Sequence, residues 1–355
     1  MTDGCEQRRT VGPRLLHLAN DNAAGYWLAQ SRTLGLPTWE GSGGADAAAG
    51  GGAGAADGGA SVVGGPVGGG VADGGGAAVG GGAASAGGAA AAGGAAGGTG
   101  ATYAACRTPT PAGFRDLIFV RRRPADAAAD LREVLLPLLR AWDTRELKVE
   151  DPYRVLELEP FGCEHGLDMP IMARLPGAEV RAPVRGVTAG DEVAVTAVEP
   201  GDPAALDAFE RTVVEGFPVP DRLPWRRGVL FPPPAAGSAG VRLWLARRHG
   251  LPAAACVTYD AGEERRVGGG AGGAVGDRAV GDRAVGVYWV ATLPEHRSRG
   301  VGRALLETVL AAFPDRVITL TATLAGEPLY RRLGFQEVGL SRWWRFPSAP
   351  RTGPA

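Results

Sequence analysis

TLPEHRSRGVGRALLETVL, residues 292–310, places the motif Arg297-x-x-Gly300-x-Gly302 directly before an apolar helical pattern. The segment that overlaps its start, VGVYWVATL (285–293), is almost continuously apolar, which is typical of a strand buried on both faces. Apolar residues of the predicted helix 300–313 fall on one stripe: Val301, Ala304, Leu305, Val309 and Ala312. The stretch therefore predicts a buried strand, a glycine-containing loop and an amphipathic helix, in that order.

The loop of this unit has the features of an anion site. A helix N-terminus presents backbone N–H groups, and together with the helix dipole they favour an anion such as pyrophosphate. Gly300 and Gly302 would let a phosphate approach the main chain, and Arg297, Arg299 and Arg303 add positive charge. The motif is neither the Gly-x-Gly-x-x-Gly of dinucleotide-binding folds nor the Gly-Lys-Ser/Thr of a P-loop. Alone, it fits either a phosphate site or a plain strand-to-helix turn.

Between 190 and 347 the sequence predicts strands and helices that follow one another closely. Asp202-Pro203 is typical of a helix start, with the aspartate as N-cap and the proline at the first helical position. His249-Gly250 predicts the turn of a hairpin, and Gly334 is placed to end a short helix, 326–333. The predicted strands of this part are 192–200, 241–248, 252–260, 285–293, 316–323 and 335–346.

Residues 11–176 contain no second Arg-x-x-Gly-x-Gly motif. Residues 13–40 predict an amphipathic helix and a turn, with Asn20 or Asp21 as a cap. A second helical pattern spans 124–144, and Pro137 is expected to kink or divide it. The predicted strands of this part are 114–121, 153–160 and 167–176.

Two low-complexity segments interrupt these patterns. Between 41 and 101 the chain is mostly Gly and Ala and holds 27 of the 58 glycines. Without large apolar side chains, this tract is predicted to be a disordered insertion. Residues 261–283 contain the tandem repeat AVGDRAVGDRAVG and predict an exposed, inserted loop. A Pro/Gly-rich linker at 177–189 divides the chain into an N-terminal α/β region, 11–176, and a C-terminal domain, 190–347.

Composition and charge narrow the classes of function. The 37 basic and 38 acidic side chains leave a formal net charge of −1, so no uniform basic field favours a nucleic-acid partner. Cys5, Cys106, Cys163 and Cys256 show no Cys-x-x-Cys spacing, which argues against a zinc site and a disulfide framework. The sequence predicts neither a signal peptide nor a membrane span, and we expect a cytoplasmic protein without a metal.

Two separated motifs give the C-terminal part a family resemblance. VATLPEHRSRGVGRAL (290–305) is similar to the acetyl-CoA motif of the GNAT N-acetyltransferase superfamily, and EPLYRRLGF (327–335) is similar to its Leu-Tyr-x-x-x-Gly-Phe motif. The resemblance covers about 190–347. It implies a GNAT-like α/β fold with a central mixed, mostly antiparallel sheet flanked by helices. The element order of 11–176 resembles the degenerate N-terminal half of tandem GNAT proteins, with no motif to anchor it.

The resemblance also implies roles for individual residues. Acetyl-CoA would be the acyl donor, and Tyr330 would protonate the departing CoA thiolate. Thr323 and Gly326 stand where the family often has asparagine and alanine, which bears on how the second motif contacts CoA. Arg297 fits equally a structural role that ties the loop to a nearby carbonyl or carboxylate. The implied donor-binding residues are Val290, Ala291 and Thr292 along the pantetheine arm, and Arg297, Ser298, Arg299, Gly300, Val301, Gly302 and Arg303 around the pyrophosphate.

Other roles stay open at the level of the sequence. The general base that would receive the proton of the amine is not identified, since Tyr288, Glu215 and ordered water relaying to a carboxylate all fit. Glu295 and His296 lie in the loop and are further candidates. Cys163-Glu164-His165 resembles a metal ligand set by residue type only.

The sequence thus predicts an enzyme that transfers an acetyl group from acetyl-CoA to a primary amine by direct attack on the thioester. The acceptor, a small-molecule amine or a protein or peptide amine, is not fixed by any motif. The alternative function is a non-catalytic CoA-binding sensor or scaffold protein, with the Gly/Ala-rich tract as a tether. No feature indicates the oligomeric state.

Overall fold

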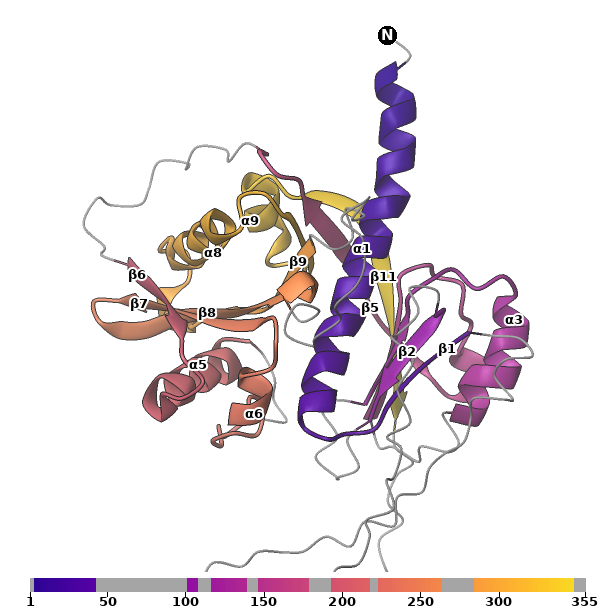
Figure 1. Cartoon of the computed structure of the whole chain (residues 1–355), viewed down its shortest axis with the longest axis horizontal. Helices are drawn as coiled ribbons and strands as arrows, with labels where there is room; N and C mark the ends of the chain where they lie inside the picture. Colours follow the sequence, from indigo (N-terminus) through magenta and orange to yellow (C-terminus); the bar gives the residue numbers. More distant parts are fainter. Residues whose placement is uncertain are drawn as a thin grey trace, which may run out of the picture.

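The computed structural model describes residues 3–42, 101–107, 116–138, 146–178, 193–217, 223–263 and 284–347. The predicted Gly/Ala-rich insertion, linker and repeat loop lie almost entirely outside these ranges. Figure 1 shows helices on both sides of a broad sheet, with helix α1 between the parts of the chain that come early and late in the sequence.

Most predicted elements are present in the predicted order. In chain order the strands are β1 (Thr38–Gly41), β2 (Tyr103–Cys106), β3 (Leu117–Val120), β4 (Glu146–Asp151), β5 (Glu164–Arg174), β6 (Val193–Val198), β7 (Val241–Arg248), β8 (Leu251–Asp260), β9 (Ala284–Thr292), β10 (Val317–Thr321) and β11 (Gln336–Pro347). The helices are α1 (Asp3–Thr33), α3 (Ala127–Asp130), α5 (Pro203–Gly216), α6 (Pro233–Ala236), α8 (Val301–Ala312) and α9 (Glu327–Arg332). Helical turns of other types are the π-helical η1 (Leu131–Leu135) and the 3-10 turns η2 (Glu159–Phe161) and η5 (Pro294–His296). Every helix in the described ranges is too short or too polar to span a bilayer.

The strands form one mixed sheet in the order β1-β2-β3-β4-β11-β5-β10-β9-β8-β7-β6. Among the described strands, only the β3–β4 and β9–β10 pairs are parallel, and the other neighbours are antiparallel. This arrangement confirms the predicted fold class, a mixed and mostly antiparallel sheet flanked by helices.

Strand β5 joins the two predicted regions within this sheet. It belongs to the predicted N-terminal region, yet it pairs with β10 on one side and with β11 on the other. In this register Ile171 lies opposite both Thr321 and Gly339, and Asp168 lies opposite Arg342. The C-terminal strands therefore depend on residues that precede the predicted linker. The division of the chain into domains at 177–189 stays a prediction.

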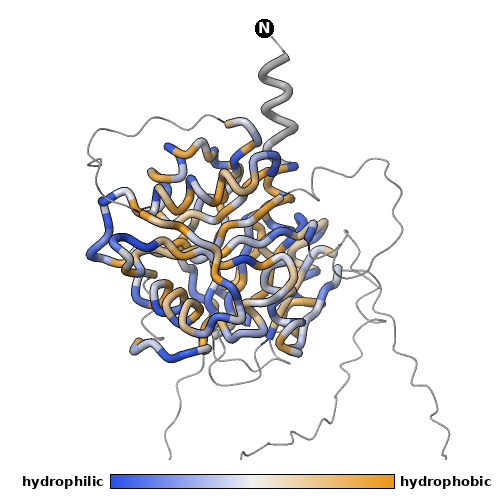
Figure 2. Tube along the Cα trace, turned by 60° about the vertical axis from the view of Figure 1, so that its left-hand side comes forward, coloured by the Kyte–Doolittle hydropathy of each residue, from blue (hydrophilic) through white to orange (hydrophobic). Residues whose placement is uncertain are grey.

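Successive side chains of a strand point to opposite faces of the sheet, and both faces are apolar. Leu243 and Leu245 of β7 pack with α5, whereas Trp244 and Ala246 pack with α8, because successive strand residues point to opposite faces. Figure 1 shows α5 and α8 on opposite sides of β6, β7 and β8. In Figure 2 the helices beside the sheet change between hydrophobic and hydrophilic colours along each turn, as expected for elements with one buried face.

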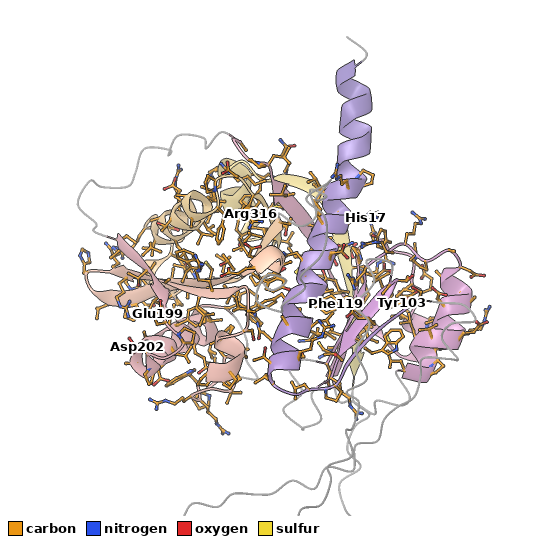
Figure 3. All side chains as sticks on the ribbon, viewed as in Figure 1. His17, Tyr103, Phe119, Glu199, Asp202 and Arg316 are labelled. Atoms are coloured by element: carbon orange, nitrogen blue, oxygen red, sulfur yellow. The ribbon has the colours of Figure 1, made fainter. Side chains whose placement is uncertain are left out.

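Three local signals for element ends are confirmed. Asp202, labelled in Figure 3, caps α5 by accepting hydrogen bonds from the backbone N–H groups of the next turn. His249 and Gly250 turn the β7–β8 hairpin with φ angles of 51° and 79°. Gly334 follows α9 with a φ of 85°, a conformation that glycine adopts without steric cost.

Helix α1 extends further than predicted and packs against both parts of the sheet. Tyr26 packs in the apolar cluster that contains α5, while Ala24 and Leu28 pack against β2 and β3. Asn20 and Asp21 lie within this helix, so the prediction that one of them caps it is wrong. Their side chains bind distant residues instead of the backbone of their own helix.

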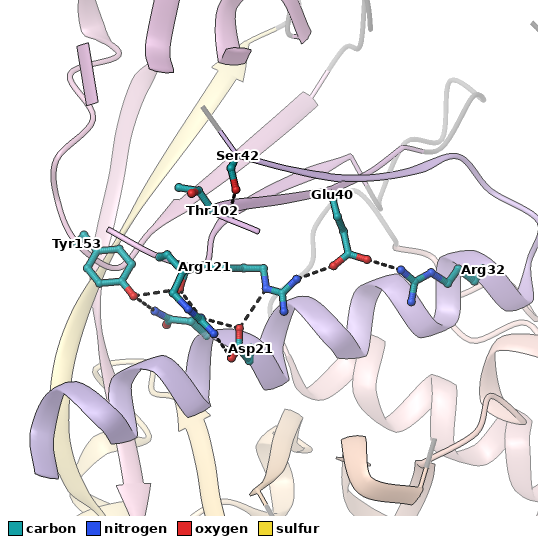
Figure 4. A network of polar contacts seen from close by, with 9 residues as sticks. Asp21, Arg32, Glu40, Ser42, Thr102, Arg121 and Tyr153 are labelled. Atoms are coloured by element: carbon teal, nitrogen blue, oxygen red, sulfur yellow. Dashed lines mark hydrogen bonds and ion pairs between the residues drawn. The ribbon is translucent and has the colours of Figure 1, made fainter. Parts of the chain in front are cut away.

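Figure 4 shows this network, in which Asp21 lies close to Arg121 and Tyr153. Both oxygens of Asp21 accept hydrogen bonds from Arg122 at 2.7 Å. Arg121 donates to Asp21 at 3.1 Å and to Glu40 at 2.5 Å. Asn20 donates to the hydroxyl of Tyr153 at 3.4 Å. The network fastens α1 to the N-terminal part of the sheet.

The predicted strand 153–160 is also wrong, since the strand of this region is β4 and ends at Asp151. The side chain of Asp151 accepts hydrogen bonds from the backbone N–H groups of Tyr153, Arg154, Val155 and Leu156 at 2.8 to 3.1 Å. Arg154 has a φ of 55°. One buried carboxylate thus satisfies the donors that a strand would need, and the chain turns.

Candidate functional site

Strands β9 and β10 run side by side only near their beginnings. Their parallel register ends with Thr319 opposite Gly286, although β9 continues to Thr292. Trp289 has a φ of 54°, and the register between β8 and β9 shifts there. Such a bulge bends a strand away from regular pairing. The end of β9 therefore presents main-chain groups that β10 does not pair.

The loop after β9 leads directly into the N-terminus of α8. Ser298 and Gly300 have φ angles of 58° and 78°, and Gly300 occupies the N-cap position. No side chain among the described residues caps this helix. Since the first N–H groups of a helix have no partner within it, those of α8 are available to an anionic ligand.

Arg297 holds this loop against its neighbours. Its Nε donates to the carbonyl oxygen of Thr292 at 3.1 Å, and its Nη2 donates to that of Gly216 at 3.0 Å. Gly216 ends α5, and a Cβ added there would lie 3.1 Å from the carbonyl carbon of Thr292. These contacts agree with a structural role for Arg297, which ties the loop to nearby carbonyl groups. They also bring the end of α5 to the end of β9.

A first cavity of about 710 Å³ opens in front of α8. The donor-site residues predicted from the sequence that line it are Val290, Thr292, Arg297, Ser298, Gly300, Val301, Gly302 and Arg303. Two other predicted residues do not line it. Ala291 is buried beside Gly216, and Nε of Arg299 donates to the carbonyl oxygen of Glu295 at 2.9 Å. The first cavity thus joins the strand and loop parts of the predicted site.

Tyr330 of α9 lines the same cavity. Only 6% of the residue is exposed, and burial, with a smaller contribution from Cys256, raises the pKa of its phenol well above the ordinary value. The ring packs edge-on against Phe335. A Cβ added to Gly326 would lie 2.7 Å from Cε2 of Tyr330, so glycine at 326 makes room for the ring. Tyr330 is therefore a neutral phenol, a hydrogen-bond and proton donor.

A second cavity, of about 430 Å³, adjoins the first. The residues that line both cavities are Phe217, Val290, Thr323 and Tyr330. The second cavity lies where α1, β4, β5, β9 and β11 meet. Tyr330 consequently lies between a cavity at a helix N-terminus and a cavity lined by residues from both parts of the sheet.

Glu150 of β4 is the carboxylate of the second cavity, and the sequence did not indicate it. It is 6% exposed, and its Oε1 accepts a hydrogen bond of 2.9 Å from the hydroxyl of Ser341. Burial raises the pKa of Glu150 to about 7, although the hydrogen bond from Ser341 lowers it. No local pattern marks this residue, because its burial depends on pairing with β11, where it lies opposite Trp343.

The candidate bases named from the sequence have other contacts. Tyr288 lines the second cavity, but its hydroxyl donates a 2.6 Å hydrogen bond to Oδ1 of Asn22, and burial raises the pKa of this phenol well above the ordinary value. Glu215 pairs with Arg211 at 2.8 Å and lines neither cavity. Of the two loop residues, His296 lines the first cavity.

The Cys163-Glu164-His165 segment does not form a metal centre with other described residues. His165 pairs with Asp168 at 3.0 Å, and Glu164 pairs with Arg345 at 2.5 Å. Burial raises the pKa of the Cys163 thiol to about 12, which disfavours the thiolate that binds metals. In the ranges that the structure describes, no group of three or more His, Cys, Asp or Glu side chains could hold a metal ion.

One segment of the C-terminal half matches a known family model. Residues 243–337 match the model described as acetyltransferase (GNAT) domain. This range contains the loop before α8 and Tyr330, while Glu150 precedes it. No curated protein matches the sequence significantly.

Several solved structures resemble the chain. A GCN5-related N-acetyltransferase from Kribbella flavida is 18% identical, with 70% of this chain and 88% of that chain covered and a TM-score of 0.45. A GCN5-related N-acetyltransferase from Sphaerobacter thermophilus is 17% identical over 70% and 78% of the two chains, with a TM-score of 0.44. A tandem GNAT protein from the clavulanic acid biosynthesis pathway is 15% identical over 70% and 80%, with a TM-score of 0.42. All three TM-scores are below 0.5, so no residue role is carried over from these proteins.

Proposed function

We propose that this chain, a member of the GNAT superfamily through its C-terminal domain, transfers an acetyl group from acetyl-CoA to a primary amine. Tyr330 lines both cavities, and its position is the main support for the proposal. A thiolate leaving from the first cavity and an amine entering from the second would meet at this phenol. A positioned donor of this kind contributes about 10²- to 10⁴-fold to a rate.

The first cavity is suited to hold the donor. The N–H groups at the start of α8 would bind the pyrophosphate of acetyl-CoA, where the helix dipole favours negative charge. Gly302 lets the start of α8 lie close to the end of β9, since a Cβ there would lie 3.0 Å from Oγ1 of Thr292. The main chain of Val290 to Thr292, which β10 leaves unpaired, would bind the pantetheine arm. The thioester would then lie near Tyr330.

The alternative function is a CoA-binding sensor or scaffold protein without catalysis. It is favoured by the contacts of Tyr288 and Glu215, neither of which is placed as a free base. A sensor would bind acetyl-CoA in the first cavity and transfer nothing. An enzyme would bind it and consume it when an acceptor amine is added.

Calorimetric titration with acetyl-CoA and a transfer assay with a panel of amines together test the proposal. We expect binding by the wild type, and Gly300→Asp should weaken it at least about tenfold, because a carboxylate would stand beside the pyrophosphate. Gly300→Asn is the matched control, since asparagine has the same shape and tolerates a positive φ. Equal affinity in all three proteins would remove the donor assignment, and binding without transfer to any amine would favour the sensor.

A further inference from the structure

The second cavity has an aromatic lining that the proposed donor site does not use. Four tryptophans from three elements line it: Trp27 of α1, Trp289 of β9, and Trp343 and Trp344 of β11. Aliphatic surface is added by Leu117, Leu167, Met169 and Val287. A volume of about 430 Å³ is in the range of pockets that enclose small organic molecules. The lining favours a ligand whose body is apolar.

The charge in this cavity indicates which polar group the ligand carries. Glu150 is the one carboxylate that the described residues place in the lining, and no cationic side chain among them pairs with it. Ser341 donates one hydrogen bond to Oε1 of Glu150. A buried carboxylate without a cation is costly, and an ammonium group of a ligand would remove that cost. Tryptophan faces also attract ammonium groups.

The same lining disfavours ligands with several ammonium groups. Lys148 and Arg345 are the cationic side chains in it, and Arg345 pairs with Glu164. The second and third ammonium groups of a polyamine would therefore lie beside positive charge, while one carboxylate serves one ammonium. A monoamine with a hydrophobic body fits the cavity best.

A small side cavity provides room for a proton relay beside Glu150. It measures about 10 Å³ and is lined by Glu150, Asn20, Tyr288 and Thr321, among others. Such a volume holds at most one water molecule, which needs polar partners of this kind. The carboxylate thus has a place for a bridging water next to the second cavity.

We propose that the second cavity is the acceptor site, that it takes a primary amine on a single hydrophobic body, and that Glu150 receives the proton of that amine. The inference rests on the proposed function and adds to it the acceptor class and the base. Glu150 precedes the range matched by the family model, so the N-terminal part of the sheet would supply the base for chemistry at the C-terminal domain.

In the proposed transfer, Glu150 takes up one proton of the acceptor and Tyr330 supplies one to the leaving thiolate. The carboxylate of Glu150, directly or through one water, takes a proton from the ammonium, which becomes a neutral amine. The amine nitrogen bonds to the thioester carbonyl carbon, and the C–S bond then breaks. Tyr330 gives its proton to the thiolate, and the second proton of the nitrogen replaces the one that Tyr330 lost. Glu150 releases its proton to solvent, and the products are an amide and CoA.

The test compares Glu150→Gln with Glu157→Gln. Glutamine keeps the shape of Glu150 but takes up no proton at neutral pH, and the exposed Glu157 provides the same chemical change on a residue that lines neither cavity. The probes are 2-phenylethylamine, tryptamine and hexylamine, with spermidine and glucosamine as polar comparisons. Binding of each amine to the CoA-saturated protein and transfer from acetyl-CoA are measured for each variant.

We expect the three hydrophobic amines to bind, and Glu150→Gln to weaken this binding at least about tenfold. The variant should lower kcat/KM for these acceptors at least about 100-fold, with affinity for acetyl-CoA within twofold of the wild type. The rise of kcat/KM with pH near about 7 should disappear in Glu150→Gln and persist in Glu157→Gln.

Two results would overturn the inference: no binding of any hydrophobic amine, or binding and kcat/KM within threefold of the wild type in Glu150→Gln. A clear preference for spermidine or glucosamine would overturn the acceptor class. Failure of the proposed function is a different result, namely acetyl-CoA that does not bind or is not consumed. Because amine binding is also measured on the protein without CoA, the acceptor site is tested even then.

Discussion

The hydroxyl of Tyr288 donates a 2.6 Å hydrogen bond to Oδ1 of Asn22, and this contact joins α1 to β9 across 266 positions of sequence. The Nδ2 group of Asn22 donates to the carbonyl oxygens of Tyr259 and Ala284, at 3.3 and 3.2 Å. Tyr288 also stacks on Tyr26, with ring centroids 4.2 Å apart. One side chain of α1 thus binds polar groups of two strands, β8 and β9, and β9 lines both cavities.

Replacement of Asn22 by alanine should therefore destabilise the whole sheet. The variant would remove the acceptor of the Tyr288 hydroxyl and the amide that donates to two strand carbonyl groups, at a cost of about 2 to 4 kcal/mol in the free energy of unfolding. Tyr288→Phe removes one hydroxyl and should cost about 1 to 2 kcal/mol. Urea denaturation measures both. A loss in Asn22→Ala no greater than that in Tyr288→Phe would contradict a central role for the amide.

The same contact explains why residue 286 is glycine. A Cβ added to Gly286 would overlap Oδ1 of Asn22 and the hydroxyl of Tyr288. We expect Gly286→Ala to cost at least about 2 kcal/mol, because a packed interior does not absorb the added atom. Gly201→Ala is the matched control, since nothing lies within 4 Å of that site. The double variant Gly286→Ala/Tyr288→Phe should cost less than the sum of the two changes, and strict additivity would show that the overlap is not the cause.

The Asp21 network gives a prediction about charge. Asp21→Asn weakens the hydrogen bonds from Arg121 and Arg122, whose side chains are 12% and 25% exposed, and should lower the free energy of unfolding by about 1 to 3 kcal/mol. Glu215→Gln breaks the exposed pair with Arg211 on a single helix and should cost less than about 0.5 kcal/mol. Thermal unfolding at low and high salt compares them. Equal costs would mean that the network adds no stability beyond that of a surface pair.

Tyr330→Phe tests the proposed general acid. The phenol is buried and its pKa is raised, so it is a neutral donor throughout the working pH range. Removal of its hydroxyl should lower kcat about 100-fold or more and change acetyl-CoA affinity little, because the ring still fills the space left by Gly326. Turnover and calorimetric affinity are measured on the same samples. Unchanged kcat would remove Tyr330 from the chemical step.

The sequence predicted those parts of the site that short segments determine. The strand, the loop and α8 follow one another within residues 284–312, so the apolar pattern and the two glycines were enough to locate them. Asp202 and Gly334 likewise act on their own helix ends. In each case the responsible contacts are made within a few residues.

The parts that were missed depend on distant segments. Glu150 is buried through its pairing with β11, and Asn22 acts on strands more than 230 positions away. The prediction of a strand at 153–160 is wrong because the side chain of Asp151 accepts hydrogen bonds from backbone N–H groups that a strand would pair with a neighbouring strand. The residue pattern within a single segment does not predict side-chain contacts of this kind, because the spacing of apolar residues indicates only which face of the segment is buried.

Glu150 also makes stability depend on pH. Its pKa is about 7 in the folded protein against an ordinary value of 4.5, so the folded state holds this proton more tightly than the unfolded state does. The stability that protonated Glu150 provides is complete below about pH 4.5 and falls as pH rises through about 7, by about 3 kcal/mol in total. Glu150→Gln does not titrate in this range and should not show this loss. Urea denaturation of the two proteins between pH 5 and 8 should give profiles that diverge as pH rises, with the variant relatively more stable at pH 8. Glu157→Gln should follow the wild type, and parallel profiles for all three proteins would show that the carboxylate of Glu150 is already charged at pH 5.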